Sequence, residues 1–491
     1  MYLIIILSSG ALKKKAFFFF RVLFYFKKEG MLLFLFWQVV NRMKVGDNLM
    51  NESKDIHPVD EILPLNQLFL YGLQHVLAMY AGAVAVPLIL ANALGLGKEQ
   101  LIYLINADLF TCGIATLIQT LGFWKMGIKI PVIQGVTFAA VTPMILIGKS
   151  HGLTGIYGSV MIAGIITYLA SPYFSRLIRF FPPVVTGSII TIIGVSLLPV
   201  AVRWAGGGVP GAKNFGEIQF IGLAFLVLTL VVFFYRYFKG FLSNIAVLLG
   251  LAAGTLIAIP LGLVNFSEVT SASWFGITTP FAFGMPIFDI SSIVAMTLVM
   301  LVVMTETTGD FIAIGEIVDK PISKEDLTRG LRADGFSTLL GGILNAFPYT
   351  AYAQNVGLVG LTRVKSRYVV AAAGAILVVL GLFPKAAAIV ASIPTPVLGG
   401  AGIAMFGMVM ASGIKTLSKI NFENNHNLMV VAVSVAVGLI PLAVPSIYQK
   451  FPEALQVILN SGITVGSVVA IVLNAILNKV DTMERDILIS K

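Results

Sequence analysis

The chain has 491 residues, of which 57% are hydrophobic and only 11% are charged. Soluble domains carry about 25% charged residues, so this composition excludes an ordinary soluble protein. The single cysteine, Cys112, excludes a disulfide framework and a cysteine metal site, and the four histidines show no metal-ligand spacing. No Walker-type GxxxxGK(S/T) loop occurs, which excludes an ATP-driven pump with a nucleotide domain of its own in this chain.

Much of the formal net charge of +10 lies in residues 1–49, so the charge does not indicate a nucleic-acid partner. This segment is rich in Phe and Lys, and Lys13–Lys15 interrupts its apolar stretches. It lacks the long apolar core and small-residue cleavage site of a signal peptide. We expect residues 1–49 to be a mis-assigned or extra N-terminal segment, with the native start at Met50 or Met43. An aromatic and basic anchor at the membrane surface is the open alternative.

Apolar stretches recur from residue 66 onward, each close to the roughly 20 residues that span a bilayer. The third and tenth of these stretches are short and contain Pro and polar residues, which predicts broken helices there. We predict fourteen membrane segments, at residues 66–87, 100–122, 131–147, 152–174, 183–203, 217–236, 241–263, 288–316, 329–347, 349–362, 367–391, 394–414, 427–447 and 459–478.

Lys and Arg concentrate in alternate loops when the tail of residues 50–65 is placed in the cytoplasm, as the positive-inside rule requires. Both termini, including the tail 479–491, are then cytoplasmic. Two sets of seven spans, 66–263 and 285–478, must insert in opposite orientations, which is the inverted-repeat plan of secondary transporters. The sequence therefore predicts an all-α polytopic protein of the cytoplasmic (inner) membrane, in contact with lipid, with a binding site where the two broken segments meet.

Few ionisable residues occur inside the predicted spans. Glu306 and Asp310 are four residues apart and therefore share one helix face. Asp334 lies early in the ninth span, and His75 lies in the middle of the first. A carboxylate at membrane depth costs several kcal/mol unless it meets a cavity or a partner. These residues therefore predict a polar cavity and the handling of protons.

Structural alternatives exist for most of these positions. Asp334 could form an ion pair at a helix end, His75 could be a satisfied core histidine, and Asp108 in the second span is expected to be structural. The adjacent amides Gln354 and Asn355 lie in the middle of a broken segment, where an amide can bond the freed backbone. One amide can do so while the other contacts a ligand.

Several motifs carry a family resemblance. Residues 354–363, QNVGLVGLTR, resemble the signature of the nucleobase–ascorbate transporter family: Gln or Glu, Asn, any residue, Gly, four variable residues, Thr, and usually a basic residue or Gly. Gln74-His75 resembles the Gln-His pair of the first span in that family. TETTGD around Glu306 and LRADG around Asp334 resemble its eighth- and ninth-span motifs. The resemblance covers about residues 60–480, and the motifs occur in the family's order.

The resemblance implies two inverted halves arranged as a core and a gate domain, a homodimer, an elevator-like motion and proton-coupled nucleobase uptake. In that family, Gln at the position of Gln354 goes with xanthine and uric acid carriers, whereas Glu goes with uracil carriers. Residues 135–138, GVTF, resemble bacterial uric acid carriers, and xanthine-selective relatives tend to carry Asn where Thr137 stands. The implied substrate is an oxidised purine, uric acid first and xanthine second.

The expected substrate site follows from the chemistry of an oxidised purine. Glu306 would accept N–H bonds as a charged acceptor, and the Gln354 amide would match a C=O/N–H edge. The backbone N–H groups near Phe138 and Ala353 would favour a partly anionic ligand, because half-helices begin there. The Phe138 ring could stack on the purine. Thr137 and Asn355 would shape the site.

Asp334 is expected to carry the coupling proton, with His75 and Asp310 holding the network beside Glu306. No metal and no cofactor other than H⁺ is expected. The alternatives are a uracil or other nucleobase permease of the same family, a sulfate-type anion carrier and a channel. An intramembrane enzyme is disfavoured, because Thr307–Asp310 lacks the first Gly of the GxGD motif of aspartyl proteases.

Overall fold

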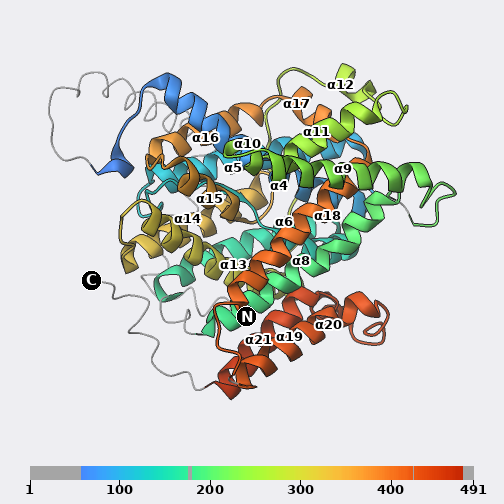
Figure 1. The fold of residues 1–491 in the computed structure, drawn as a ribbon. Helices are drawn as coiled ribbons and strands as arrows, with labels where there is room; N and C mark the ends of the chain where they lie inside the picture. Colours follow the sequence, from blue (N-terminus) through green and yellow to red (C-terminus); the bar gives the residue numbers. More distant parts are fainter. Residues whose placement is uncertain (1–56, 175–179, 209, 424, 479–491) are drawn as a thin grey trace. The chain divides into compact units, whose positions relative to one another are not determined.

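The computed structural model of the chain describes residues 57–174, 180–208, 210–423 and 425–478 (Figure 1). The segment 1–49, the predicted tail 479–491 and residues 50–56 of the predicted tail 50–65 lie outside these residues. The chain divides into two compact units, Met1–Ile62 and Leu63–Lys491. The described part of the first unit contains the 3-10 turn η1 (Pro58–Asp60), where the His57 ring accepts the N–H of Val59.

The second unit is built almost entirely of helices (Figure 1). Its first half comprises α4 (Leu65–Leu94), α5 (Lys98–Leu121), β1 (Gln134–Val136), η2 (Phe138–Ala140), α6 (Val141–Ala170), η3 (Ser171–Tyr173), α8 (Pro183–Ala205), α9 (Ile218–Tyr237), α10 (Phe241–Asn244) and α11 (Ala246–Ala258). Its second half comprises α12 (Ser267–Ser271), α13 (Ile290–Ile317), α14 (Lys324–Ile343), β2 (Tyr349–Ala351), α15 (Ala353–Thr362), α16 (Arg367–Leu380), α17 (Pro384–Ala391), α18 (Thr395–Leu417), α19 (Asn425–Ala443), α20 (Glu453–Leu459) and α21 (Gly462–Leu477).

Eight helices of the described chain are long and apolar enough to cross a membrane, or nine if the bent pair α16–α17 forms one span. That pair bends by 84°, so the predicted segment 367–391 is a broken one. Two predicted segments, 131–147 and 152–174, share one long helical stretch that breaks at Gly152, where φ is 66° and ψ is −169°. The multi-pass helical architecture is confirmed, while the count of fourteen crossings remains a prediction.

Among the described residues, β1 and β2 pair to form a two-stranded sheet. Each strand lies in one of the two segments that were predicted to be broken, 131–147 and 349–362. Pro131 and Pro348 precede the strands. Because proline cannot donate a backbone hydrogen bond and disfavours helix in the residue before it, each of these positions favours a break in the helix.

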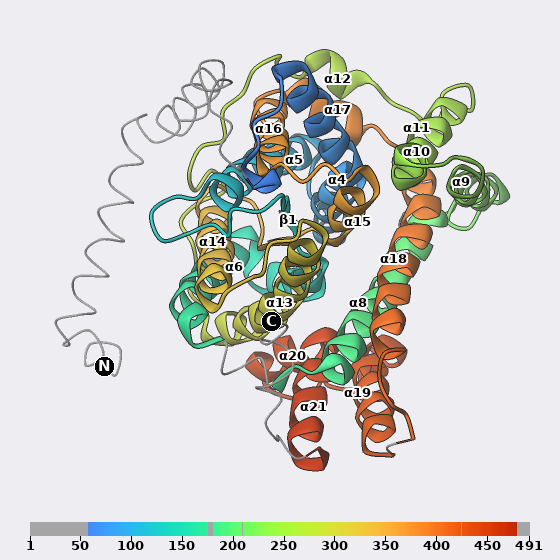
Figure 2. The ribbon, with the colours of Figure 1, turned by 60° about the vertical axis from the view of Figure 1, so that its left-hand side comes forward.

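Close helix packing depends on small residues. The α6–α14, α5–α16 and α8–α18 pairs have the most extensive contacts, and Figure 2 shows α8 and α18 running side by side. A Cβ on Gly335 of α14 would lie 2.5 Å from the backbone nitrogen of Tyr168 and 2.8 Å from the carbonyl oxygen of Gly164 in α6. Glycine therefore permits the close backbone approach that membrane helices use to pack.

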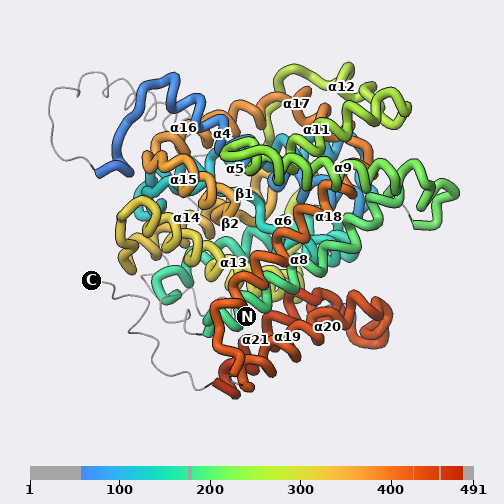
Figure 3. The backbone as a smooth tube through the Cα atoms, in the orientation of Figure 1, coloured from blue at the N-terminus to red at the C-terminus, as the bar shows by residue number. Residues whose placement is uncertain are grey.

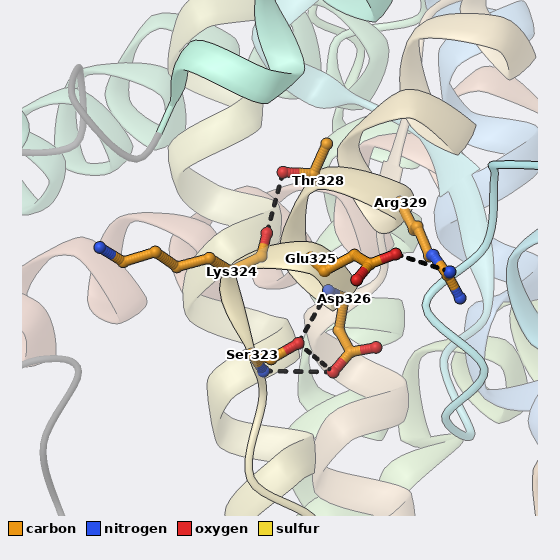
Figure 4. Close-up of polar contacts among 6 residues, drawn as sticks. All are labelled: Ser323, Lys324, Glu325, Asp326, Thr328 and Arg329. Carbon is orange, nitrogen blue, oxygen red and sulfur yellow. Dashed lines mark hydrogen bonds and ion pairs between the residues drawn. The ribbon is translucent and has the colours of Figure 1, made fainter.

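The first turn of α14 is fixed by a capping box (Figure 4). The hydroxyl of Ser323 accepts the N–H of Asp326 at 3.1 Å, and the Asp326 carboxylate accepts the hydroxyl and the N–H of Ser323. Arg329 pairs with Glu325 one turn apart at 2.7 Å. With its start defined in this way, α14 carries Asp334 in its third turn, inside the helix bundle and away from the helix end.

Candidate functional site

The two broken segments meet in the structure as an antiparallel strand pair (Figure 3). In this pair, Gln134 lies opposite Ala351 and Val136 lies opposite Tyr349. Helical backbone begins soon after each strand, at Phe138 in the first half and at Ala353 in the second. Two helix N-termini thus follow the paired strands, and the positive end of a helix dipole favours an electronegative ligand.

The free edge of β1 is covered by side chains of α5. The N–H of Gln134 donates to the Thr116 hydroxyl at 3.0 Å, and the Cys112 thiol donates to the Gln134 carbonyl at 2.6 Å. A backbone group without a partner is costly where no water is available, and a two-stranded sheet leaves an edge open on each strand. The hydroxyl and the thiol therefore take the place of a third strand.

The free edge of β2 is covered in the same way by α13 and α14. The N–H of Ala351 donates to the Thr307 hydroxyl at 3.2 Å, and the N–H of Tyr349 donates to the Thr338 hydroxyl at 3.2 Å. The hydroxyl of Thr350 lies 2.9 Å from that of Thr307. Each strand is thus held by helices of its own half of the chain, and both edges are closed.

Removing one of the side-chain hydroxyl groups that bond the open strand edges should destabilise the β1–β2 pair. Thr116→Val keeps the side-chain shape but leaves the N–H of Gln134 without an acceptor, and we expect a loss of about 1–3 kcal/mol in the free energy of unfolding. Thermal unfolding of the purified protein in detergent measures this as a lower apparent melting temperature. Thr116→Ser, which keeps the hydroxyl, is the matched control. Equal stability of the valine variant and the wild type would contradict the role given to this hydroxyl.

Tyr352 connects the end of β2 to α4 and β1. A Cβ at Gly82 of α4 would lie 2.1 Å from the Tyr352 hydroxyl, and one at Gly135 of β1 would lie 2.3 Å from its ring. The two glycines therefore form the space that this buried ring fills. The ring fixes the approach of the chain to Ala353 and Gln354, and sequence reasoning did not identify it.

The adjacent amides at the start of α15 have different environments. Asn355 is buried, and its Nδ2 donates to the backbone carbonyl of His75 at 2.9 Å and lies 3.0 Å from the ring Nδ1 of His75. The preceding Ala353 and Gln354 are exposed. This geometry agrees with the expectation that one amide ties the broken segment to another span, while the other can contact a ligand.

Glu306 lies on α13, the helix that packs against both β2 and α15. Its side chain is partly buried, and within the described part of the chain no hydrogen bond or ion pair engages its carboxylate. A carboxylate in an apolar span without a protein partner is costly. Glu306 is thus the charged group that a polar ligand between α13 and α15 would meet.

Thr137 and Phe138 form the N-terminal end of the other short helix. The Thr137 hydroxyl accepts the N–H of Ala139 at 3.2 Å, which is the contact of a helix cap. The Phe138 ring packs edge-to-face on Phe406 of α18, with centroids 5.9 Å apart. Phe138 therefore bridges the site and the α8–α18 pair, and its stacking on a purine remains a prediction.

Asp334 is fully buried on α14 and accepts a hydrogen bond from the Gln119 amide of α5 at 2.9 Å. It forms neither of the two ion pairs between described residues, and the guanidinium of the nearby Arg332 lies over the Tyr168 ring instead. The helix-end ion pair considered as an alternative is therefore not formed. Asp310 has a buried carboxylate oxygen with no partner among the described residues.

The expected network of titratable residues is divided in the structure. His75 contacts Asn355, and no hydrogen bond between described residues joins His75 to Asp334. Asp310 on α13 is the acidic neighbour of Asp334, and Glu306 lies near Asp310 one turn earlier on the same helix. The geometry therefore associates His75 with the broken segment and Asp334 with α5 and α13.

One face of α5 carries a row of polar residues that was not predicted from the sequence. Asp108, Cys112, Thr116 and Gln119 follow one another at spacings of four, four and three residues, which places them on one face of α5. Asp108 accepts the Tyr349 hydroxyl at 2.9 Å, in agreement with its expected structural role. The regular spacing of polar residues within an apolar span was the signal that could have identified the row.

Comparison with known proteins decides the family. A family model described as "Permease family", Xan_ur_permease, matches residues 66–447. The chain belongs to this permease family. The resemblance to nucleobase–ascorbate transporters is thereby confirmed, and this permease is a multi-pass membrane transporter rather than an enzyme.

Two relatives illustrate the similarity of this permease to characterised bacterial proteins. It is 50% identical over 431 residues to the uric acid transporter UacT of Escherichia coli (strain K12), covering 87% of this chain and 89% of that protein. It is 48% identical over 407 residues to the xanthine permease of Bacillus subtilis (strain 168), covering 83% of this chain and 93% of that protein.

Solved structures share the fold of the permease at low sequence identity. The transmembrane domain of the cyanobacterium bicarbonate transporter BicA aligns with a TM-score of 0.54 at 16% identity, covering 85% of this chain and 99% of that one. The murine Solute Carrier 26 family member A9 anion transporter, in the inward-facing state, aligns with a TM-score of 0.57 at 12% identity, covering 88% and 75%. At these identities the likeness concerns the fold alone.

Proposed function

We propose that this permease takes up oxidised purines, uric acid and xanthine, across the cytoplasmic membrane. The observation that carries the proposal is the partly buried carboxylate of Glu306, which has no protein partner in the described chain and lies on the helix that borders β2 and α15. The names of the relatives, a uric acid transporter and a xanthine permease, support the same substrate class.

The chemistry of the site suits such a ligand. Ionised Glu306 can accept the N–H donors of an oxidised purine, and a charged acceptor makes the stronger hydrogen bonds. The exposed Gln354 amide offers a donor and an acceptor for a C=O/N–H edge. The N–H groups at Phe138 and Ala353 open the two short helices and favour partial negative charge on the ligand. Thr137 and Asn355 hold the backbone that presents these groups.

Proton coupling is the second part of the proposal. Asp334 is buried, has one carboxylate oxygen without a partner among described residues, and lies near the acidic Asp310 of α13. The proton affinity of a buried carboxyl group beside another acid changes when a conformational change alters its exposure or its neighbours. Asp310 and His75 are the other titratable residues of the proposed proton-coupling network. No other cofactor and no metal enters the proposal.

The finer architecture also belongs to the proposal. Fourteen spans in two inverted halves would divide into a core domain with α4–α6 and α13–α16 and a gate domain with α8–α11 and α18–α21. In support, the closest contacts of α5, α6 and α14 lie within the first set, and those of α8, α18 and α19 within the second. Movement of the core against the gate would provide alternating access. A homodimer in the inner membrane, surrounded by lipid and with both termini cytoplasmic, completes the arrangement.

An uptake competition panel tests this function. Cells without purine transport of their own, expressing the permease, should accumulate labelled urate, and unlabelled urate or xanthine should compete. An excess of uracil or sulfate should leave uptake unchanged, because Gln354 replaces the Glu of uracil carriers and an inorganic anion has no N–H donors for Glu306. Competition by uracil but not by urate or xanthine would transfer the assignment to a uracil permease. A proton-collapsing agent should abolish accumulation.

A further inference from the structure

Gln134 of β1 has an unusual environment for an amide. The residue is fully buried, and its side-chain amide lies beside the Asp334 carboxylate without making a hydrogen bond of regular geometry to any described residue. Its backbone, in contrast, is bonded on its open edge to α5. A buried primary amide without partners is rare, because leaving one donor or acceptor unmade costs about 1–3 kcal/mol.

The neighbour of this amide is Asp334. The two oxygens of that carboxylate differ, because Oδ1 accepts the Gln119 amide at 2.9 Å, while Oδ2 has no partner in the described chain. Gln119 is itself held in place, since its Nε2 also donates to the carbonyl of Gly330 and its Oε1 accepts the N–H of Ile128. The polar side chains of Gln134 and Thr307 lie next to Asp334. Oδ2 is therefore the oxygen left for a proton.

The charged groups around Asp334 come from few elements. α13 contributes Asp310, which is also near Glu306, and α14 itself contributes Arg332, whose guanidinium lies over the Tyr168 ring of α6. Towards Asp334, α5 presents the uncharged amide of Gln119. No cation among the described residues forms an ion pair with Asp334.

We propose that Gln134 is a positioning residue whose amide binds Asp334 in both of its protonation states and so transmits that state to strand β1. The inference rests on the proposed function, in which Asp334 carries the coupling proton. An ionised Oδ2 accepts a hydrogen bond from Nε2 of Gln134. A protonated Oδ2–H donates to Oε1 instead, which requires the amide to turn by about 180° about its last torsion. No covalent bond other than the O–H bond of the carboxyl group forms or breaks.

The turn of the Gln134 amide changes whether its outward-facing half is a hydrogen-bond donor or an acceptor. In one state the half of the amide that points away from Asp334 is an acceptor, and in the other it is a donor. Because Gln134 pairs with Ala351 in the strand ladder and precedes Phe138 by four residues, the change occurs beside the substrate site rather than within it. Thr307 gives a parallel connection, since its hydroxyl lies next to Asp334 and accepts the N–H of Ala351.

Two substitutions separate this role from a structural one. Gln134→Met keeps the shape of the side chain but removes both halves of the amide. Gln134→Glu keeps the shape and places a second carboxyl group against Asp334, and two adjacent carboxyl groups hold a shared proton to higher pH. The purified permease is reconstituted in liposomes. Counterflow of labelled urate at equal pH and urate accumulation driven by an inward proton gradient are measured in the same preparation.

For Gln134→Met, we expect counterflow within about twofold of the wild type and gradient-driven accumulation at least about tenfold lower, with a flattened pH profile. For Gln134→Glu, we expect the pH of half-maximal accumulation to rise by about one unit or more. The ratio of the two activities does not depend on how much protein is folded, so a structural defect lowers both activities and leaves the ratio unchanged.

An unchanged ratio and an unchanged pH profile in both variants would overturn the inference. If the wild type itself shows no response of urate accumulation to the proton gradient, the proposed function fails first. If the wild type responds and both variants behave like it, the role of Gln134 alone is lost.

Discussion

Glu306→Gln is expected to lower the efficiency of urate uptake by roughly 10- to 100-fold while the permease remains folded. The substitution keeps the size of the side chain but replaces a charged acceptor by a neutral amide with an extra donor. A hydrogen bond to a charged group contributes about 1.5–3 kcal/mol, and each 1.4 kcal/mol is about tenfold in affinity. Initial rates of labelled urate uptake over a range of concentrations measure the effect.

Folding should be unaffected, because within the described chain no protein group depends on the Glu306 carboxylate. Glu316→Gln is the matched control, since Glu316 lies on the same helix, α13, and is exposed. Wild-type affinity and rate in Glu306→Gln would remove Glu306 from the substrate site. Equal losses in both variants would point to α13 as a whole rather than to this carboxylate.

Asp334→Asn is expected to abolish concentrative uptake and to leave exchange of substrate across the membrane in place. Asparagine can still accept the hydrogen bond that the Gln119 amide gives to Asp334 at 2.9 Å, but it cannot take up a proton. With one proton per substrate, a gradient of one pH unit, worth about 1.4 kcal/mol, supports roughly tenfold accumulation. The accumulation ratio of the variant should fall to one.

Measurements in proteoliposomes with and without an inward proton gradient decide this prediction. Glu325→Gln serves as control, because Glu325 lies in the first turn of the same helix and forms only an exposed ion pair with Arg329 (Figure 4). Such pairs contribute about 0–1 kcal/mol, so this variant should match the wild type. Gradient-driven accumulation by Asp334→Asn at the level of the wild type would assign the coupling proton to another group, with Asp310 and Glu306 next to be tested.

Much of the site was predictable, because membrane depth makes polar residues conspicuous. Glu306 attracted attention as a charge in an apolar span, and the two broken segments did so through their Pro residues and their equivalent positions. That one of the two adjacent amides bonds another span was also anticipated, and in the structure this amide is Asn355. Residues with no charge, such as Gln134, Gln119 and Tyr352, escaped notice, since an isolated amide or phenol in a span has many ordinary explanations.

The sequence by itself determined that the chain is a helical membrane transporter, where its helices break, and which family it resembles. These properties follow from local composition and short motifs. Only the tertiary structure decided which residues meet. Gln119 and Asp334 are 215 residues apart in the chain, and Asn355 and His75 are 280 apart. Their contacts arise because every polar group that enters the interior must find a partner, and that partner is set by how the helices pack rather than by sequence distance.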